Sequence, residues 1–176
     1  MPSFTDKKSP ARRVALAGIL GAEALALSWL ESLLPAFPFL PPGAKPGLSN
    51  IVTMFALYAL GPGQALMILL ARCFLGAVFA GNMNALLFSV MGGLTAMIVM
   101  ILLSRMRRLS VYGVSVGGAA AHNCGQVAAA VLSLGNPAPL YYLPILLGVS
   151  LFTGALTGLI VGCLFRALAH TNLMKE

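Results

Sequence analysis

Three polar side chains lie in the middle of a long apolar stretch. His122, Asn123 and Gln126 fall within Ala119–Ala130, which reads AAAHNCGQVAAA and is itself part of the apolar run Val111–Leu134. Residues four apart share one face of a helix, so His122 and Gln126 point the same way, with Asn123 about 100° round from His122. An apolar run of this length can cross a bilayer, and polar groups near the middle of such a run are costly unless they face protein, water or a ligand. Their chemistry is hydrogen bonding, and we expect them to line a ligand-binding cavity.

Two opposite charges fall at matching depth in other apolar runs. Glu23 lies roughly 14 Å from the start of its run and Arg72 roughly 14 Å from the end of its own, at about 1.5 Å per residue, and these two ends fall on the same side if successive runs alternate in direction. A lone charge there costs at least about 2.5–3.5 kcal/mol, so each needs a partner. One interpretation is a structural ion pair that joins two helices. The other is that Arg72 lines the same cavity as His122 and binds a polar or anionic ligand; both hold if Glu23 orients Arg72.

The sequence lacks the residue patterns of an enzyme. It contains no GxxxxGK[ST] phosphate loop and no GxSxG, and Glu23 and Glu31 are the only interior carboxylates. No pair of them can hold Mg²⁺ against a diphosphate in the usual carboxylate scheme. His122 and Cys124 face different ways on a helix, and the three cysteines form no CxxC. We therefore expect no catalytic residue, no metal, no cofactor and no enzymatic activity of this chain alone.

The composition excludes an ordinary soluble domain. Hydrophobic residues make up 59% of the chain and charged residues 9%, and the mean hydropathy is +0.93. The net charge of +7 does not indicate nucleic-acid binding, because the cations flank apolar runs instead of forming a surface stripe.

Six apolar runs predict an all-α integral membrane protein with six transmembrane helices. They are Val14–Leu34, Leu48–Leu60, Gln64–Ala80, Ala85–Ser104, Val111–Leu134 and a helix within Tyr141–Ala169. The second run is short, so we expect it to be tilted or completed by part of the proline-rich loop Pro35–Pro46. The predicted organisation is a cytoplasmic leader (1–13), a six-helix membrane domain (14–169) and a cytoplasmic tail (170–176). Because further spans follow, the first run is expected to be an uncleaved span and not a signal peptide.

The distribution of cations predicts the orientation. Nine of the eleven Lys and Arg residues flank the runs on the side that holds both termini, whereas Lys45 falls on the other side and Arg72 within a run. This asymmetry predicts a multi-pass protein of the cell (inner) membrane with both termini in the cytoplasm. Lys45 stands in a stiff outer loop, and Asn50 follows at the mouth of the second span. We expect both to contact the ligand, Lys45 favouring an anionic one, although a solvated loop lysine is the alternative.

Small residues recur along the first run. Ala11, Ala15, Gly18 and Ala22 follow one another at three- and four-residue intervals. Such a stripe lets another helix pack backbone to backbone. The partner is either a neighbouring helix of this chain or a separate subunit, and the sequence leaves both open.

Several segments resemble one family of small membrane proteins. They are GAKPGLSNIVT at Gly43–Thr53, ALYALGP at Ala56–Pro62, RCFLG at Arg72–Gly76, AHNCGQ at Ala121–Gln126 and PLYYLP at Pro139–Pro144. The family is labelled heptaprenyl diphosphate synthase component I, or Gx transporter, and the resemblance covers nearly the whole chain beyond the leader. Pro46 departs from the commoner KLGL form of the first segment.

That family is in turn similar to the S components of energy-coupling factor (ECF) transporters. These are six-helix proteins that bind a vitamin-like solute and work with a membrane coupling subunit and two ATPases. Small residues of their first helix contact the membrane coupling subunit. The resemblance implies an S-component-like bundle in the lipid bilayer that binds a small vitamin-like solute and needs those partners, with the Ala11–Ala22 stripe as the contact. Lys45 and Arg72 predict that this solute is anionic. Two alternatives stay open: an accessory membrane subunit of isoprenoid or quinone synthesis, and a self-sufficient carrier in which Glu23 and His122 relay protons. The synthase label conflicts with the missing Mg²⁺-binding carboxylates.

The predicted orientation can be tested by cysteine labelling. In a cysteine-free background, Lys45→Cys should react with an impermeant thiol reagent in intact cells, and Arg107→Cys should not. The opposite pattern would mean that the orientation is inverted.

Overall fold

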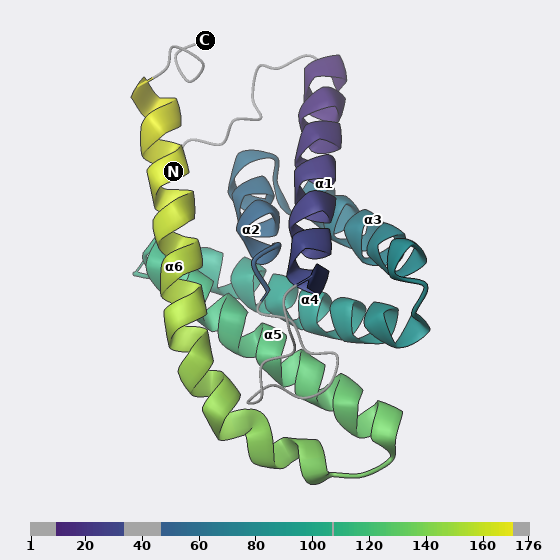
Figure 1. Cartoon of the computed structure of the whole chain (residues 1–176). Helices are drawn as coiled ribbons and strands as arrows, with labels where there is room; N and C mark the ends of the chain where they lie inside the picture. Colours follow the sequence, from purple (N-terminus) through teal and green to yellow (C-terminus); the bar gives the residue numbers. More distant parts are fainter. Residues whose placement is uncertain (1–9, 34–46, 107, 171–176) are drawn as a thin grey trace.

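The computed structural model describes residues 10–33, 47–106 and 108–170. These residues form six α-helices and a short 3-10 helix, and no strand occurs among them (Figure 1). The elements are α1 (Pro10–Leu33), α2 (Asn50–Ala59), α3 (Pro62–Ala80), α4 (Met83–Ser104), α5 (Val111–Leu134), η1 (Ala138–Tyr142) and α6 (Leu143–His170). Each predicted apolar run therefore contains a helix, and the all-α prediction is confirmed.

The number of helices that can span a membrane is smaller than predicted. By length and apolarity, four described segments qualify: Ala11–Leu33, Pro62–Ala80, Met83–Ser104 and Ala138–Leu168. Helix α2 has ten residues, about 15 Å, which is half of a hydrocarbon core of about 30 Å. Helix α5 is long enough, with 24 residues, but its polar side chains and glycines lower its hydropathy. The structure thus supports an all-α membrane protein without establishing six spans.

Glycine, proline and asparagine set the sharp turns on either side of α3. Pro62 occupies the first position of α3, where its missing N–H costs no helical hydrogen bond. The helix ends at Gly81, whose φ of 60° lies in the left-handed region that favours glycine. Asn82 then caps α4, because its side chain accepts a hydrogen bond from the backbone N–H of Asn84 at 2.9 Å. The chain therefore reverses between α3 and α4 within a few residues.

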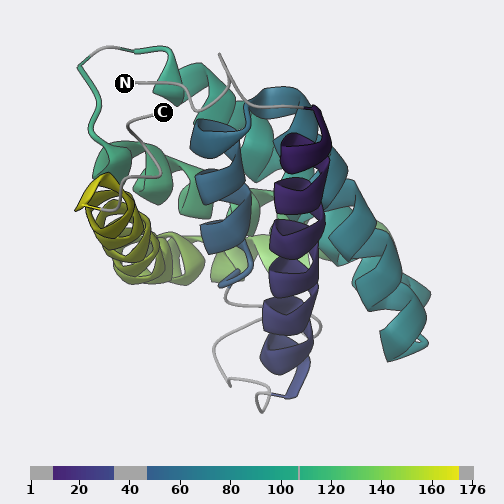
Figure 2. The same cartoon turned by 90° about the horizontal axis from the view of Figure 1, so that it is seen from above.

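The helices form two groups that meet at the centre of the molecule. Helix α5 packs along α4 and α6, and α3 packs against α1, α2 and α4. Helix α2 lies between α1 and α6 in both views (Figures 1 and 2). The described start of α1 and the described end of α6 lie at the same end of the molecule, at the top of Figure 1.

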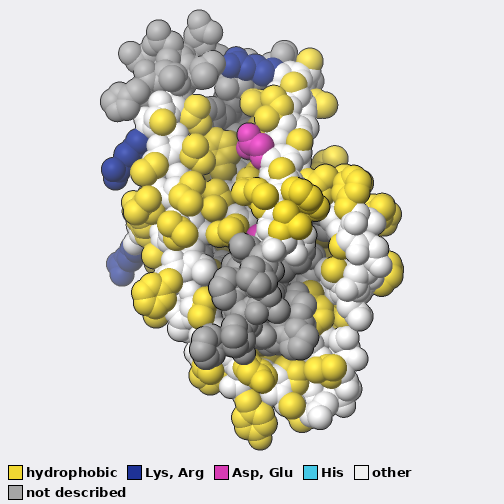
Figure 3. Space-filling model, viewed as in Figure 1, with side chains coloured by type: hydrophobic (Ala, Val, Ile, Leu, Met, Phe, Trp, Pro, Cys, Tyr) yellow, Lys and Arg dark blue, Asp and Glu magenta, His cyan; other side chains and the backbone are white. Residues whose placement is uncertain are grey.

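The outer surface is largely apolar. Met67, Phe79 and Phe152 are 71%, 70% and 80% exposed, and hydrophobic side chains cover most of the described part of the face in Figure 3. Exposed apolar area on this scale is unfavourable in water and suits contact with lipid. The membrane assignment therefore follows from the surface as well as from the helix lengths.

Helices α4, α5 and α6 approach one another at backbone distance. A Cβ atom at Gly125 of α5 would collide with the carbonyl oxygen of Met91 in α4. A Cβ atom at Gly154 of α6 would lie 2.6 Å from Cα of Val116 in α5. Real Cβ atoms do not come that close to backbone atoms, so glycine is required at both contacts.

Alanine at Gly154 should push α6 away from α5, because the added methyl group meets backbone and not a flexible side chain. We expect Gly154→Ala to destabilise the protein by about 1–3 kcal/mol, measured by thermal unfolding in detergent. The matched control is Gly148→Ala on the same helix, where a Cβ atom meets nothing within 4 Å. This control should be neutral or slightly stabilising, and equal losses in the two variants would contradict the packing argument.

Candidate functional site

Arg72 is the cation at the centre of the candidate site. Helix α3 carries it, and only 4% of the residue is exposed. Its Nη1 donates to the hydroxyl of Ser49, and its Nη2 donates to Oδ1 of Asn50 at 3.3 Å. A buried guanidinium is stable only with such acceptors, so the turn Gly47–Asn50 that leads into α2 is fixed against α3.

Glu31 completes the network from the last turn of α1. It is 4% exposed, and its carboxylate accepts hydrogen bonds from the backbone N–H of Leu48 and, at 3.2 Å, from the hydroxyl of Ser49. A serine hydroxyl has one donor and two acceptor sites. Ser49 therefore donates to Glu31 and accepts from Arg72, which links the two charges through one oxygen atom.

The predicted ion pair between Glu23 and Arg72 is not formed among the described residues. Glu23 is exposed and lies eight residues before Glu31, about 12 Å nearer the start of α1. The prediction compared depths as if the helices were parallel, whereas α1 and α3 are strongly inclined to each other in Figures 1 and 2. Arg72 therefore meets the carboxylate nearer the end of α1, through the intervening turn.

His122 and Gln126 share the inner face of α5, as the four-residue spacing predicts. They are 4% and 2% exposed. A Cβ atom at Gly92 would lie 2.9 Å from Cε1 of His122 and 3.0 Å from Cγ of Gln126, and one at Gly47 would lie 3.3 Å from Cδ2 of His122. The imidazole ring therefore lies between two glycines, one in α4 and one in the turn.

Several buried polar atoms of this cluster have no hydrogen-bond partner in the described part of the chain. They are both ring nitrogens of His122, whose ring lies against the backbone of Gly92, together with Oε1 of Gln126, Oγ of Ser115 and Nε of Arg72. Buried polar atoms are normally hydrogen-bonded, so such a group of atoms marks a place for a ligand or ordered water. A cavity of about 10 Å³ borders on Gly47, Asn50, Ser115, Gly118, Thr153 and Thr157 among others, and the His122 ring lies against Gly47. We call the space between these buried polar side chains the chamber. Its volume is close to that of one water molecule, so the chamber is closed in this structure.

Asn123 faces a different neighbour. Its side-chain nitrogen donates to the carbonyl oxygen of Leu146 and to the hydroxyl of Ser150, both at 2.9 Å and both in α6. These bonds tie α5 to α6 and use the amide donors. Of the predicted ligand residues, the structure thus brings together Asn50, Arg72, His122 and Gln126, and it places Asn123 on another side of α5. Lys45 lies outside the described residues.

The sequence analysis did not assign Glu31, Ser49 and Ser115 to the site. The available signal for Glu31 was its rarity, because only two carboxylates occur between the leader and the tail. Ser49 and Ser115 gave no comparable signal. The proton relay suggested for Glu23 and His122 is not assembled, since Glu23 is exposed on α1 and His122 is enclosed between Gly47 and Gly92.

The small-residue stripe on α1 faces outward. Ala11, Ala15, Gly18 and Ala22 are all exposed, and a Cβ atom at Gly18 meets nothing within 4 Å. The buried face of α1 carries other residues: Leu20, Ala24, Ser28 and Glu31. Packing against another helix of this chain is therefore not the use of the stripe in the described part of the structure.

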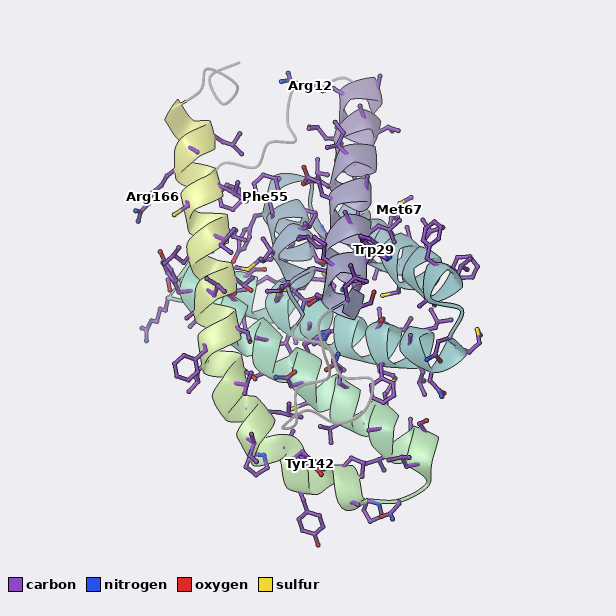
Figure 4. The ribbon with its side chains drawn as sticks, viewed as in Figure 1. Arg12, Trp29, Phe55, Met67, Tyr142 and Arg166 are labelled. Atoms are coloured by element: carbon purple, nitrogen blue, oxygen red, sulfur yellow. The ribbon has the colours of Figure 1, made fainter. Side chains whose placement is uncertain are left out.

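A separate groove lies between α1, α2 and α6. Its volume is about 380 Å³, and its walls are mainly leucine, isoleucine, valine and phenylalanine, with Arg12, Arg13 and Glu23 contributed by α1. Figure 4 shows Arg12 at the free end of α1 and Arg166 pointing away from the bundle. The groove is distinct from the buried chamber and shares only α2 and α6 with it.

The fold and the buried cluster define an all-α membrane protein with a closed polar chamber between its helices. The chain belongs to the family described as heptaprenyl diphosphate synthase component I, whose family model matches residues 20–164. The resemblance seen in the sequence is thereby confirmed. No curated protein and no solved structure matches the chain.

The link through Ser49 predicts energetic coupling between Arg72 and Glu31. We expect Arg72→Leu to destabilise the protein by about 3–5 kcal/mol, because it removes a buried cation that is linked to the carboxylate of Glu31 through Ser49. The double variant Glu31→Gln/Arg72→Leu should lose at least about 1 kcal/mol less than the sum of the two single losses, measured by thermal unfolding in detergent.

Glu23 provides the matched control for this cycle, since it is the same residue type on the same helix. Glu23→Gln should add to Arg72→Leu within about 0.5 kcal/mol. If Glu23→Gln is coupled to Arg72→Leu and Glu31→Gln is additive with it, then Glu23 and not Glu31 is the carboxylate linked to Arg72.

Proposed function

We propose that this chain is the solute-binding subunit of an ECF-type transporter. It takes up a small vitamin- or cofactor-like solute, and separate coupling and ATPase subunits supply the energy. The observation that carries the proposal is the group of unpartnered, buried polar atoms on His122, Gln126, Ser115 and Arg72. Within a membrane protein, such polar side chains are a functional site by default.

A purely structural role would leave these atoms bonded to protein. Asn123 illustrates that case, because its amide donors are both used in contacts with α6. His122 and Gln126 lie on the same helix, are equally buried, and have ring and amide atoms without partners. The contrast within one helix supports ligand binding at His122 and Gln126 and a structural role for Asn123.

The Gly47–Asn50 turn is suited to open the chamber. It contacts the His122 ring through Gly47, whose φ of 83° is left-handed, and it is held mainly by side chains of Glu31 and Arg72. Moving this turn away from the chamber breaks a few side-chain hydrogen bonds and leaves the backbone hydrogen bonds of the long helices intact. A solute can then replace the contacts that the turn makes in the closed chamber.

The need for partners rests on two observations. The sequence has no nucleotide-binding motif, so ATP hydrolysis must come from another protein. The stripe of Ala11, Ala15, Gly18 and Ala22 is exposed, as a helix of a coupling subunit would require for close backbone approach. On this proposal the chain binds and hands over solute, and it is not an enzyme by itself.

One observation favours a second function, an accessory role in isoprenoid synthesis. The groove between α1, α2 and α6 combines an apolar wall with Arg12 and Arg13, which suits an apolar chain that ends in a diphosphate. The description of the family points the same way. Glu23 in the wall of the groove and the lack of Mg²⁺-binding carboxylates argue against catalysis there.

Native mass spectrometry of the protein purified from its own membrane tests the proposal. We expect a bound small molecule, which Gln126→Leu should reduce at least about tenfold, because an apolar side chain cannot replace the buried amide. Glu23→Gln, which changes a groove residue outside the chamber, should retain it.

Two other results would count against this function. A bound isoprenoid diphosphate that survives Gln126→Leu and is lost in Arg12→Gln/Arg13→Gln would favour the accessory role. If Gln126→Leu retains a small polar solute as well as the unmodified protein does, the solute does not bind in the chamber.

A further inference from the structure

The groove between α1, α2 and α6 exists because α2 is short. Helices α1 and α6 both pack on α2, and they have 24 and 28 residues, whereas α2 has ten. Both long helices extend beyond the end of α2 in Figure 1, so α2 fills only part of the space between them. The rings of Phe55 in α2 and Phe165 in α6 stack with their centroids 5.1 Å apart, which fixes α2 against α6 where Phe55 lines the groove.

Most of the groove wall is apolar and open to the surroundings. The wall includes Leu16 and Ile19 of α1 and Leu164 of α6. Ile19 is 57% exposed and Leu164 is 41% exposed, so the groove is not covered by protein along this side in the described part of the chain. Its volume of about 380 Å³ lies within the range of about 300–1,000 Å³ that is typical of ligand pockets. A hydrocarbon chain can therefore enter the groove directly from a bilayer.

One end of the groove is basic. Arg12 and Arg13, in the first turn of α1, line it there. They are the second and third residues of the candidate span Ala11–Leu33, which places them at the level of lipid head groups. Figure 4 shows Arg12 at the free end of α1. The Nε atom of Arg13 is buried and has no hydrogen-bond partner in the described part of the chain, and such a donor favours an acceptor from outside the chain.

We infer that this groove binds an anionic glycerophospholipid. One acyl chain lies in the apolar part of the groove, the phosphate lies against Arg12 and Arg13, and the second acyl chain stays in the bilayer. Guanidinium groups bind phosphate through paired N–H donors, and basic pockets between membrane helices bind anionic head groups. The start of α1 adds a helix dipole that favours an anion. The groove is separate from the chamber, so this inference does not depend on the proposed uptake of a solute.

Two features favour a phospholipid over an isoprenoid diphosphate in the same groove. A diphosphate is usually held through Mg²⁺ and carboxylates. Glu23 is the one carboxylate among the described residues that line the groove, and it follows Arg13 by ten residues, about 15 Å along α1. It therefore does not contact a head group at the arginines. The open side of the groove also leaves the second chain of a phospholipid in contact with the bilayer.

Native mass spectrometry of the delipidated full chain in detergent tests the inference. The probes are phosphatidylglycerol, which is anionic, and phosphatidylcholine with the same acyl chains, which is zwitterionic. The unmodified protein should bind phosphatidylglycerol at least about tenfold more tightly, because each basic side chain near the head group favours the anionic lipid. Arg12→Gln/Arg13→Gln should lose this preference.

Arg105→Gln/Arg108→Gln is the matched control. It removes two exposed arginines between α4 and α5, on the side of the membrane that the cation distribution predicts for Arg12 and Arg13 as well, and neither residue lines the groove. This variant should keep the preference for phosphatidylglycerol. An equal loss in the two double variants would assign the preference to general surface charge and overturn the inference, and so would a preference that survives Arg12→Gln/Arg13→Gln.

Competition experiments on the unmodified protein need no variant. Glycerol 3-phosphate, which has the phosphate without acyl chains, should not displace phosphatidylglycerol, and displacement would mean that the site takes a soluble phosphate. Farnesyl diphosphate that displaces phosphatidylglycerol at equal concentration would favour the accessory role and overturn the inference. Equal binding of the two phospholipids would overturn it as well.

Discussion

Burying the guanidinium of Arg72 is the constraint on which the centre of the molecule depends. Its desolvation cost has to be offset by acceptors, and no regular helix brings enough of them to α3. The chain supplies them from Ser49, in the turn before α2, and from Asn50, the first residue of α2, and Glu31 then holds that turn through Ser49 and the N–H of Leu48. The residue directly before α2, Ser49, is therefore used to bind Arg72.

The other side of the chamber has a different construction. Helices α4, α5 and α6 meet through glycines at backbone distance, which fixes His122 and Gln126 on a wall that has little freedom to move. Asn123 adds hydrogen bonds between α5 and α6. The chamber thus combines a rigid wall of close-packed helices with a cover that is held by a few polar side chains. That division matches a site that must open for a solute and still present its hydrogen-bonding atoms at fixed positions.

The sequence predicted what depends on apolar runs and helical period. It placed a helix in every predicted run, gave the bounds of α5 without error, and put His122 and Gln126 on one face. It misassigned the partner of Arg72, because depth along parallel helices says nothing about helix inclination or about side chains of an irregular turn. It likewise grouped Asn123 with His122, since a 100° offset does not decide which neighbour fills that direction. Of the six predicted spans, length and apolarity support four in the described part of the chain, because α2 is short and α5 carries polar side chains.

The polarity of α5 has a consequence for how the protein is made. A helix with His122, Asn123 and Gln126 near its centre partitions poorly into lipid as a single segment, so the insertion machinery cannot release it alone. Its glycine contacts with α4 are available as soon as α5 has been synthesised, whereas the α6 groups that bind Asn123 emerge from the ribosome later. We therefore expect α4 and α5 to enter the bilayer as a pair that waits for α6, so that the order of synthesis becomes part of the folding pathway.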